Sequence, residues 1–179
     1  MKKLSIKWDS EKALSLSAMF ISFITLLIFI YQTNLMRRQN YISILPYLQI
    51  ATSNNVEDYT FELNLKNHGV GPAIIEKVTM RYGEEEYDLG AYENDVFTFL
   101  QAIAPALDSV THFSNSTLDR GIAIPANTTY NVFRVYESEK DYGRVRETIG
   151  RLMSEGLDFE LRFKSIQDEH WVIRPDSGG

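Results

Sequence analysis

The sequence predicts a mainly β protein, in which an N-terminal transmembrane helix is followed by an antiparallel β-sandwich with two helical insertions. Three observations support this prediction. Residues 13–36 contain no charged side chain. Residues 59–66 alternate apolar and polar side chains, which is the period of a half-buried strand. Aromatic residues make up 12% of the chain, which favours strands over a helical bundle.

The uncharged segment Ala13–Met36 is expected to be a retained membrane anchor. A helix over these residues would rise about 36 Å, enough to cross a hydrocarbon core of about 30 Å. The alternatives are a cleaved signal peptide and a buried core helix. The apolar run is longer than that of a signal peptide, and no small-residue cleavage site follows it. The expected membrane boundaries are Lys12, Tyr31, Arg37 and Arg38.

These features divide the chain into five predicted parts. The parts are an N-terminal flank (1–12), a transmembrane helix (13–36), a juxtamembrane linker (37–45), a β-sandwich domain (46–174) and a tail (175–179). The basic residues on the two sides of the apolar segment are nearly balanced. The sequence therefore leaves open which side of the membrane carries the domain.

The predicted domain is acidic and contains no cysteine. The first 36 residues carry a net charge of +2, so the rest of the chain carries −8, because the whole chain carries −6. An acidic domain repels polyanions, which argues against general nucleic-acid binding but leaves room for a local basic pocket that takes a small anion. The lack of cysteine excludes disulfides, thiolate metal sites and cysteine nucleophiles.

Turn residues separate the predicted strands. Asn67, Gly69, Gly71 and Pro72 form the clearest turn, in which the glycines make positive-φ backbone available. A further turn around Gly83 predicts a hairpin. The strands are expected at residues 47–52, 59–66, 73–82, 107–113, 122–126, 130–136, 158–165 and 170–174.

Two segments between the strands have helical spacing. Residues 94–103 place apolar side chains on one face, with Asn94 as the N-cap. Residues 138–154 begin at Ser138 with a sequence like a capping box, and Gly156 ends the helix. Seven or eight short strands with two helical insertions are typical of an immunoglobulin-like topology. The apolar face of the second helix is expected to contain Val145, Ile149, Leu152 and Met153.

Three segments of the chain resemble a known group of proteins: YQTNLMRRQNYISILPYL, LKNHGVGPAIIEKV and GIAIPANTTYNVFRV. The group consists of small bacterial single-pass membrane proteins of unassigned function. They share an N-terminal anchor, a basic stop of the LMRRQ type and an Asn-x-Gly-x-Gly-Pro-Ala turn, which residues 67–73 match. Similar turns occur in immunoglobulin-like adhesion modules. The resemblance therefore implies an immunoglobulin-like domain at a bacterial inner membrane, and no catalytic residues to carry over.

The most distinctive charged cluster consists of Lys140, Arg144, Arg146 and Arg151 on the second predicted helix. These side chains could grip a phosphate or the carboxylates of a partner. Solvated pairing with neighbouring carboxylates is favoured by their spacing of three or four residues. The neighbouring carboxylates are those of Glu137, Glu139, Asp141, Glu147 and Glu155. The three histidines lack the spacing of a helical metal pair, and the sequence contains no nucleophile elbow and no phosphate-binding loop.

The sequence therefore predicts a non-catalytic interaction module, tethered to membrane lipid by residues 13–36, that binds a partner protein or its own copies. The alternative is a sensor of a small ligand, such as a cyclic nucleotide, that perturbs the bilayer in bacterial defence. No enzymatic activity, cofactor or metal is expected. An exposed apolar patch without a deep pocket would favour the module, whereas arginines that converge with aromatic side chains on a cavity would favour the sensor.

Overall fold

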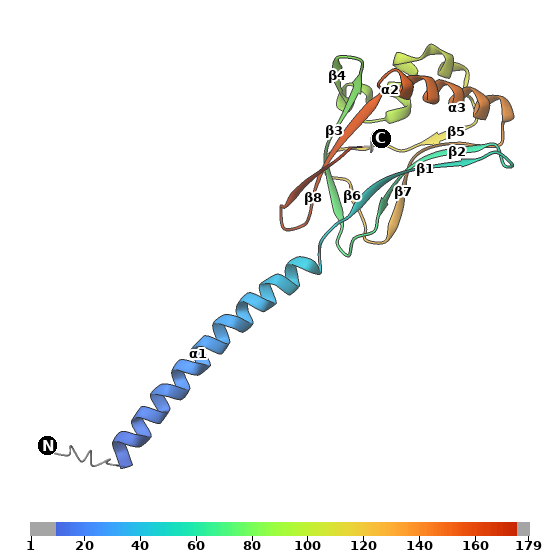
Figure 1. Ribbon diagram of the computed structural model, residues 1–179. Helices are drawn as coiled ribbons and strands as arrows, with labels where there is room; N and C mark the ends of the chain where they lie inside the picture. Colours follow the sequence, from blue (N-terminus) through green and yellow to red (C-terminus); the bar gives the residue numbers. More distant parts are fainter. Residues whose placement is uncertain (1–9, 175–179) are drawn as a thin grey trace. The chain divides into compact units, whose positions relative to one another are not determined.

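The computed structural model describes residues 10–174, and Figure 1 shows their helices and strands. The chain forms two compact units, and the boundary between them lies between Ile42 and Ser43. The first unit contains the long helix α1. The second contains all of the strands together with helices α2 and α3.

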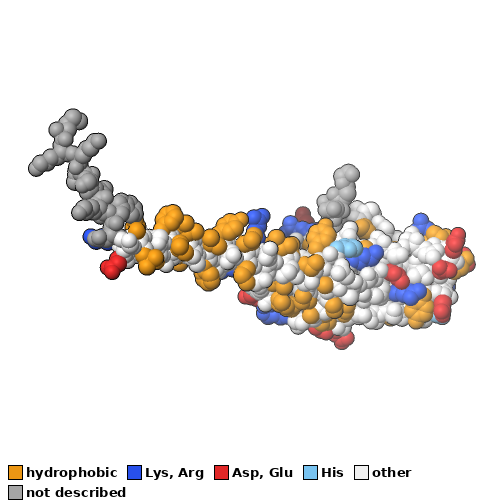
Figure 2. All heavy atoms as spheres, turned by 90° about the horizontal axis from the view of Figure 1, so that it is seen from below, with side chains coloured by type: hydrophobic (Ala, Val, Ile, Leu, Met, Phe, Trp, Pro, Cys, Tyr) orange, Lys and Arg blue, Asp and Glu red, His pale blue; other side chains and the backbone are white. Residues whose placement is uncertain are grey.

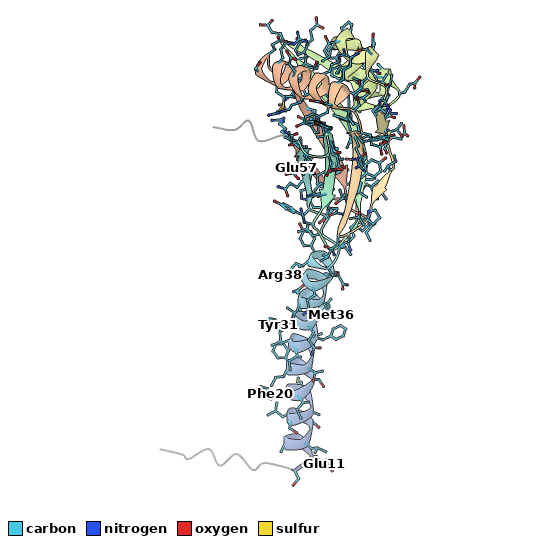
Figure 3. All side chains as sticks on the ribbon, turned by 90° about the vertical axis from the view of Figure 1, so that its right-hand side faces the viewer. Glu11, Phe20, Tyr31, Met36, Arg38 and Glu57 are labelled. Atoms are coloured by element: carbon cyan, nitrogen blue, oxygen red, sulfur yellow. The ribbon has the colours of Figure 1, made fainter. Side chains whose placement is uncertain are left out.

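Helix α1, Ser10–Ile42, is long and apolar enough to span a membrane. None of its residues is buried, and Figure 2 shows hydrophobic side chains along its visible face. In Figure 3 the side chains of Phe20, Tyr31 and Met36 project outward from it. The hydroxyls of five residues donate to main-chain carbonyls three or four residues earlier, so the helix satisfies these polar groups internally; the residues are Ser15, Ser17, Ser22, Thr25 and Thr33.

Helix α1 is longer than the predicted membrane span. It continues through residues 37–42, which belong to the juxtamembrane linker predicted at residues 37–45. Arg37 and Arg38 end the apolar run, but arginine is a good helix former, and neither glycine nor proline occurs before Pro46. The connection between α1 and the first strand is therefore shorter than predicted.

Sheet A consists of four antiparallel strands in the order β1-β2-β7-β5. The alternating segment predicted at residues 59–66 is confirmed as β2, which pairs with β1 along its whole length. A bulge between Leu63 and Asn64 interrupts the register of β2 with β7. The strands are β1 (Leu48–Asn55), β2 (Thr60–Asn67), β5 (Phe113–Asn115) and β7 (Thr128–Val135).

Sheet B is also antiparallel and has the strand order β4-β3-β8-β9, and β6 pairs with the start of β3. One hairpin turns around Gly83, as predicted, and the other joins the strands predicted at residues 158–165 and 170–174. Gly83 between β3 and β4 and Asp168 between β8 and β9 both have positive φ. The strands are β3 (Ala73–Tyr82), β4 (Glu85–Asp88), β6 (Ala123–Ile124), β8 (Asp158–Lys164) and β9 (His170–Ile173).

Both predicted helices of the second unit are confirmed. Helix α2, Val96–Ile103, begins at Asp95 and not at Asn94, because the carboxylate of Asp95 accepts two main-chain N–H groups of the first turn. Helix α3, Glu139–Ser154, begins at Ser138 as predicted. Figure 1 shows α2 and α3 together at one end of the two sheets.

Two further predictions on the helices and strands of this unit are wrong. The strand predicted at residues 107–113 begins instead within the 3-10 helix η2, Pro105–Ser109, because a proline in the first turn favours a helical start. A second 3-10 helix, η1, covers Leu89–Tyr92. Met153 is 57% exposed although it was predicted on the apolar face of α3, because its neighbour Leu152 occupies the buried position.

One hydrophobic core lies between the two sheets and the two helices. Sheet A contributes Leu65 and Phe133, sheet B contributes Ile75 and Leu161, and α2 contributes Phe97, all fully buried. The rings of Phe97 and Phe133 lie 5.4 Å apart between their centroids, so aromatic packing joins α2 to sheet A.

Candidate functional site

A groove of about 510 Å³ opens between the two sheets beside strand β1. Its floor is apolar: Leu48, Phe61 and Phe133 are buried there, and Ile50 and Leu63 are half-buried. Sheet B, α2 and α3 complete the lining, so every layer of the domain takes part. Their side chains include Met80, Leu100, Ile149, Met153, Phe159 and Ile173.

The groove is open because β1 and β9 are the last strands of their sheets and do not pair with each other within residues 10–174. Polar side chains stand along its lining: Gln49 and Thr52 on β1, Asp158 on β8 and Arg174 after β9. An apolar floor with a few polar groups is the usual composition of a binding site.

Strand β1 ends sheet A with eight residues, LQIATSNN, none of which is charged. In the described part of the chain its only strand partner is β2. The row of main-chain N–H and C=O groups on its other side is therefore open to a further strand. The groove and this open edge adjoin each other, because Leu48, Ile50 and Thr52 of β1 line the groove.

The side chain of Asn67 fixes the start of β1. Its amide oxygen accepts hydrogen bonds from the N–H groups of Tyr47 (3.1 Å) and Gly69 (2.9 Å). Its amide nitrogen donates to the carbonyl oxygens of Gly71 (2.9 Å) and Ile124 (3.0 Å). Because Asn67 is only 1% exposed, water does not replace these bonds. One side chain thus joins the entry to β1, the 67–72 turn and β6.

Gly69 and Gly71 are needed in this turn for close approach. The sequence predicted positive φ there, but neither glycine has it. A Cβ atom on Gly71 would overlap the carbonyl group of Ile44, and one on Gly69 would overlap the main chain at Leu45 and Tyr47. The turn therefore packs main chain directly against the main chain that leads into β1.

The four basic residues of α3 do not line the groove. Lys140, Arg144 and Arg151 line a separate depression on the surface of α3, and Arg146 lies outside it. The guanidinium group of Arg144 donates to the hydroxyl of Ser109. Within residues 10–174, none of the four basic side chains forms a salt bridge within 4.0 Å of a carboxylate.

Two of the carboxylates expected to pair with these cations have other partners. Glu155 accepts a hydrogen bond from the hydroxyl of Tyr82 at 2.6 Å, which raises the pKa of that tyrosine. Asp141 Oδ2 accepts the main-chain N–H groups of Thr111 and His112, both at 3.1 Å. Burial raises the pKa of Asp141, but these bonds and the His112 side chain outweigh it and lower the pKa to about 2. Asp141 therefore ties the loop before β5 to α3.

A further buried carboxylate, that of Glu160, meets three arginines on the outer face of sheet B. Oxygens of Glu160 accept hydrogen bonds from Arg174 Nη2 at 2.6 Å, Arg162 Nε at 2.8 Å and Arg81 Nη2 at 3.3 Å. Glu160 is 3% exposed, and the bonds from Arg174 and Arg162 lower its pKa to about 2. The cluster links β3, β8 and the end of β9. Arg81 also pairs with Glu86 of β4 at 2.8 Å, so the ion network extends across sheet B from β4 to the end of β9.

Sequence reasoning missed both the groove and the Glu160 cluster. Alternation along β8 places Glu160 and Arg162 on one face, which is a signal that the sequence contains. Arg81 and Arg174 join them only through the pairing of β8 with β3 and β9. The groove has no sequence signal, because its two edge strands come from opposite ends of the domain.

A scan against protein-family models and a search of the curated proteins find no match to this chain.

Proposed function

We propose that this protein is a membrane-tethered, non-catalytic interaction module that binds a partner protein, or a second copy of itself, along the groove and the open edge of β1. The observation that carries the proposal is that the groove and the open edge share Leu48, Ile50 and Thr52. An open edge offers main-chain hydrogen bonds, and the groove beside it offers apolar contact. These are the two components of recognition by strand addition.

The second unit is proposed to be an immunoglobulin-like β-sandwich. The support is the strand order, since β1-β2-β7-β5 and β4-β3-β8-β9 correspond to sheets A-B-E-D and C′-C-F-G of that topology. The single core shared by the two sheets supports the same assignment. Helix α3 then replaces the short connection between strands E and F.

Residues 13–36 of α1 are proposed to contact membrane lipid, with Lys12, Tyr31, Arg37 and Arg38 at the boundaries. The support is the length, apolar composition and exposure of α1. The resemblance to bacterial single-pass proteins makes the inner membrane the proposed location, with either side open to the domain. A shared membrane raises the local concentration of tethered domains, so even a weak edge contact is populated.

A sensor of a small anionic ligand, such as a cyclic nucleotide, is the second candidate. It is favoured by the depression on α3, where the cations Lys140, Arg144 and Arg151 have no ion-pair partner in the described chain. The acidic side chains of Glu139 and Glu147 also line this depression. Arginine and lysine in such a setting suit phosphate groups. The depression is separate from the apolar groove, and we therefore rank the sensor below the interaction module.

Site-specific photo-crosslinking in intact membranes tests the interaction module. A benzophenone side chain at Met153, which is exposed beside the groove, is expected to form protein adducts. The same probe at Ser114 on β5, the opposite edge of sheet A, is the matched control. Thr52→Trp fills the groove from its rim and is expected to reduce the Met153 adducts. Equal adduct yields at Met153 and Ser114, or none at either residue, would sink the proposal.

Equilibrium dialysis with a radiolabelled cyclic dinucleotide separates the two candidates. The interaction module predicts no saturable binding by the full chain in nanodiscs. Saturable binding that Arg144→Ala abolishes, together with no adducts at Met153, would favour the sensor.

A further inference from the structure

Strand β1 lacks the features by which edge strands normally avoid pairing with another chain. Natural edges are protected by shortness, charge, proline or bulges. β1 has eight residues, no charge and no proline, and it pairs with β2 without a register shift. By contrast, β4 carries Glu85, Glu86 and Asp88, and β5 has only three residues. Of the sheet edges in the described chain, β1 is the longest and the least protected.

The charge of the domain favours a copy of β1 as the added strand. The chain beyond residue 36 carries −8, so two copies repel unless they meet where charge is absent. Antiparallel pairing of β1 with a second β1 about a two-fold axis places no like charges opposite each other. The same arrangement of β4 would place its acidic side chains opposite one another.

Exposed apolar side chains flank β1 at its two ends. Tyr47 is 62% exposed just before the strand, and Val56 is 57% exposed just after it. In an antiparallel pair the start of one strand lies beside the end of the other, so Tyr47 of one copy approaches Val56 of the other. Pairing therefore removes from water apolar surface that a single copy leaves exposed.

The groove gains a cover from the same pairing. Leu48 and Ile50 of β1 point into the groove. A second β1 that continues the sheet points its own Leu48 and Ile50 to the same side of the joined sheet, because opposite residues of an antiparallel pair share a face. The added apolar side chains then lie over the open side of the groove.

We propose that β1 pairs antiparallel with β1 of a second copy, joining two A sheets into one continuous sheet and covering both grooves. This inference rests on the proposed interaction-module function and names the partner as another copy tethered in the same membrane.

Disulfide mapping in the full-length chain tests the pairing, and the chain contains no native cysteine. Cys replaces each residue from 49 to 53 in turn, and each single variant is oxidised in native membranes. Two-fold pairing brings the residue at the axis opposite itself, with Cα atoms about 4.5–5.5 Å apart, which a disulfide can bridge. The disulfide dimer is expected to peak at one position, with a yield about tenfold that of the Ser114→Cys control. Equal yields at all six positions would overturn the inference.

A charged side chain introduced on the open edge of β1 provides an independent test of the pairing. Ser53 is exposed and lies opposite Glu62 on β2, so Ser53→Lys leaves the fold intact while it places a charge at the joined edge. Combined with whichever of Gln49→Cys and Ala51→Cys crosslinks better, Ser53→Lys is expected to lower the dimer yield about tenfold. Ser53→Thr, which adds no charge and suits a strand, is expected to leave the yield unchanged. A dimer that persists in Ser53→Lys is held by other contacts, including α1, and overturns the inference.

Failure of this inference and failure of the proposed function give different results. If Met153 forms adducts with a different protein and no β1 disulfide forms, self-pairing is rejected and the interaction-module function is kept. If neither adducts nor disulfides form, both the self-pairing and the interaction-module function are rejected.

Discussion

The two sheets of the domain end on edge strands of opposite character. Sheet B ends on β4, with Glu85, Glu86 and Asp88, and on the short β9, beside which Arg174 is bound to Glu160. Sheet A ends on β1, whose eight residues carry no charge. The difference indicates that the charge of β4 and the short length of β9 protect the edges of sheet B, whereas β1 has neither protection.

The open edge of β1 is nevertheless firmly held at its start. Tyr47 donates its N–H to Asn67 and accepts the N–H of His68 at 2.8 Å. The carbonyl oxygen of Leu45 accepts the N–H of Val70 at 3.0 Å. A force applied to the chain before β1 must therefore break these bonds before it can separate β1 from β2. β1 combines a fixed start with an unprotected side, and the following substitutions separate these two properties.

Gly71→Ala is expected to give the largest effect, because it breaks the fixed start of β1. The new Cβ would overlap the carbonyl group of Ile44, which is main chain and cannot move aside cheaply. We expect a loss of about 3–5 kcal/mol in the free energy of unfolding, measured by urea unfolding in detergent. Gly143→Ala on the exposed side of α3 meets no atom within 4 Å and is expected to be neutral or stabilising by up to about 1 kcal/mol. Similar losses for the two variants would show that the turn is not closely packed.

Asn67→Asp is expected to be the next most severe change. It keeps both acceptor functions of the side chain but replaces the donor to Gly71 and Ile124 with a carboxylate oxygen. Each buried group left unpaired costs about 1–3 kcal/mol, so a total loss of about 2–4 kcal/mol is expected in the same urea assay. Asn127→Asp is the control, because Asn127 is an exposed turn residue with φ of 53°, which Asp also tolerates. A neutral Asn67→Asp would mean that water reaches this turn.

The sequence predicted those parts of the fold that depend on local pattern. Strand β3 has the predicted bounds of residues 73–82, and α3 begins at the predicted Ser138, because alternation and capping residues mark both. The strand at residues 107–113 was wrong because Pro105 directs a short helix there. Helix α1 continues beyond residues 13–36 through residue 42, because the charged residues Arg37 and Arg38 end the apolar run but do not end a helix.

The candidate site depends on contacts that the sequence does not encode locally. The Asn67 turn was visible as a turn, but the carbonyl of Ile124 that Asn67 binds lies 57 positions away. The cations of α3 were expected to pair with nearby acids such as Asp141. That carboxylate is instead satisfied by the loop at Thr111 and His112, 30 and 29 positions earlier. The edge character of β1 became visible only once its strand order in sheet A was known.

Acid is expected to lower the stability that the Glu160 ion network gives to sheet B. The pKa of Glu160 is lowered from its usual 4.5 to about 2 by Arg174 and Arg162, so its stabilising effect is complete above about pH 4.5 and is lost as the pH falls to about 2. Glu160→Gln is expected to lower the free energy of unfolding by about 1–2 kcal/mol at pH 7 and to flatten its fall below pH 4.5. Asp141, with a pKa of about 2, keeps part of the acid dependence in the variant. Identical pH profiles for the wild type and Glu160→Gln would remove Glu160 as a source of acid sensitivity.

Ser53→Lys gives the smallest expected change in stability and the sharpest test of the comparison, because it gives β1 a charged edge, as β4 has in sheet B. Ser53 lies opposite Glu62, so the new ammonium group meets a carboxylate, and the free energy of unfolding is expected to change by less than about 0.5 kcal/mol. The matched variant Thr129→Lys places the same side chain at an exposed position of β7 opposite Lys66 and is expected to cost about 0.2–1 kcal/mol more. Both values are measured by urea unfolding at dilutions at which the chain is monomeric. If Ser53→Lys proved the more destabilising of the two, the edge of β1 would be packed against another part of its own chain and would not be open to a partner.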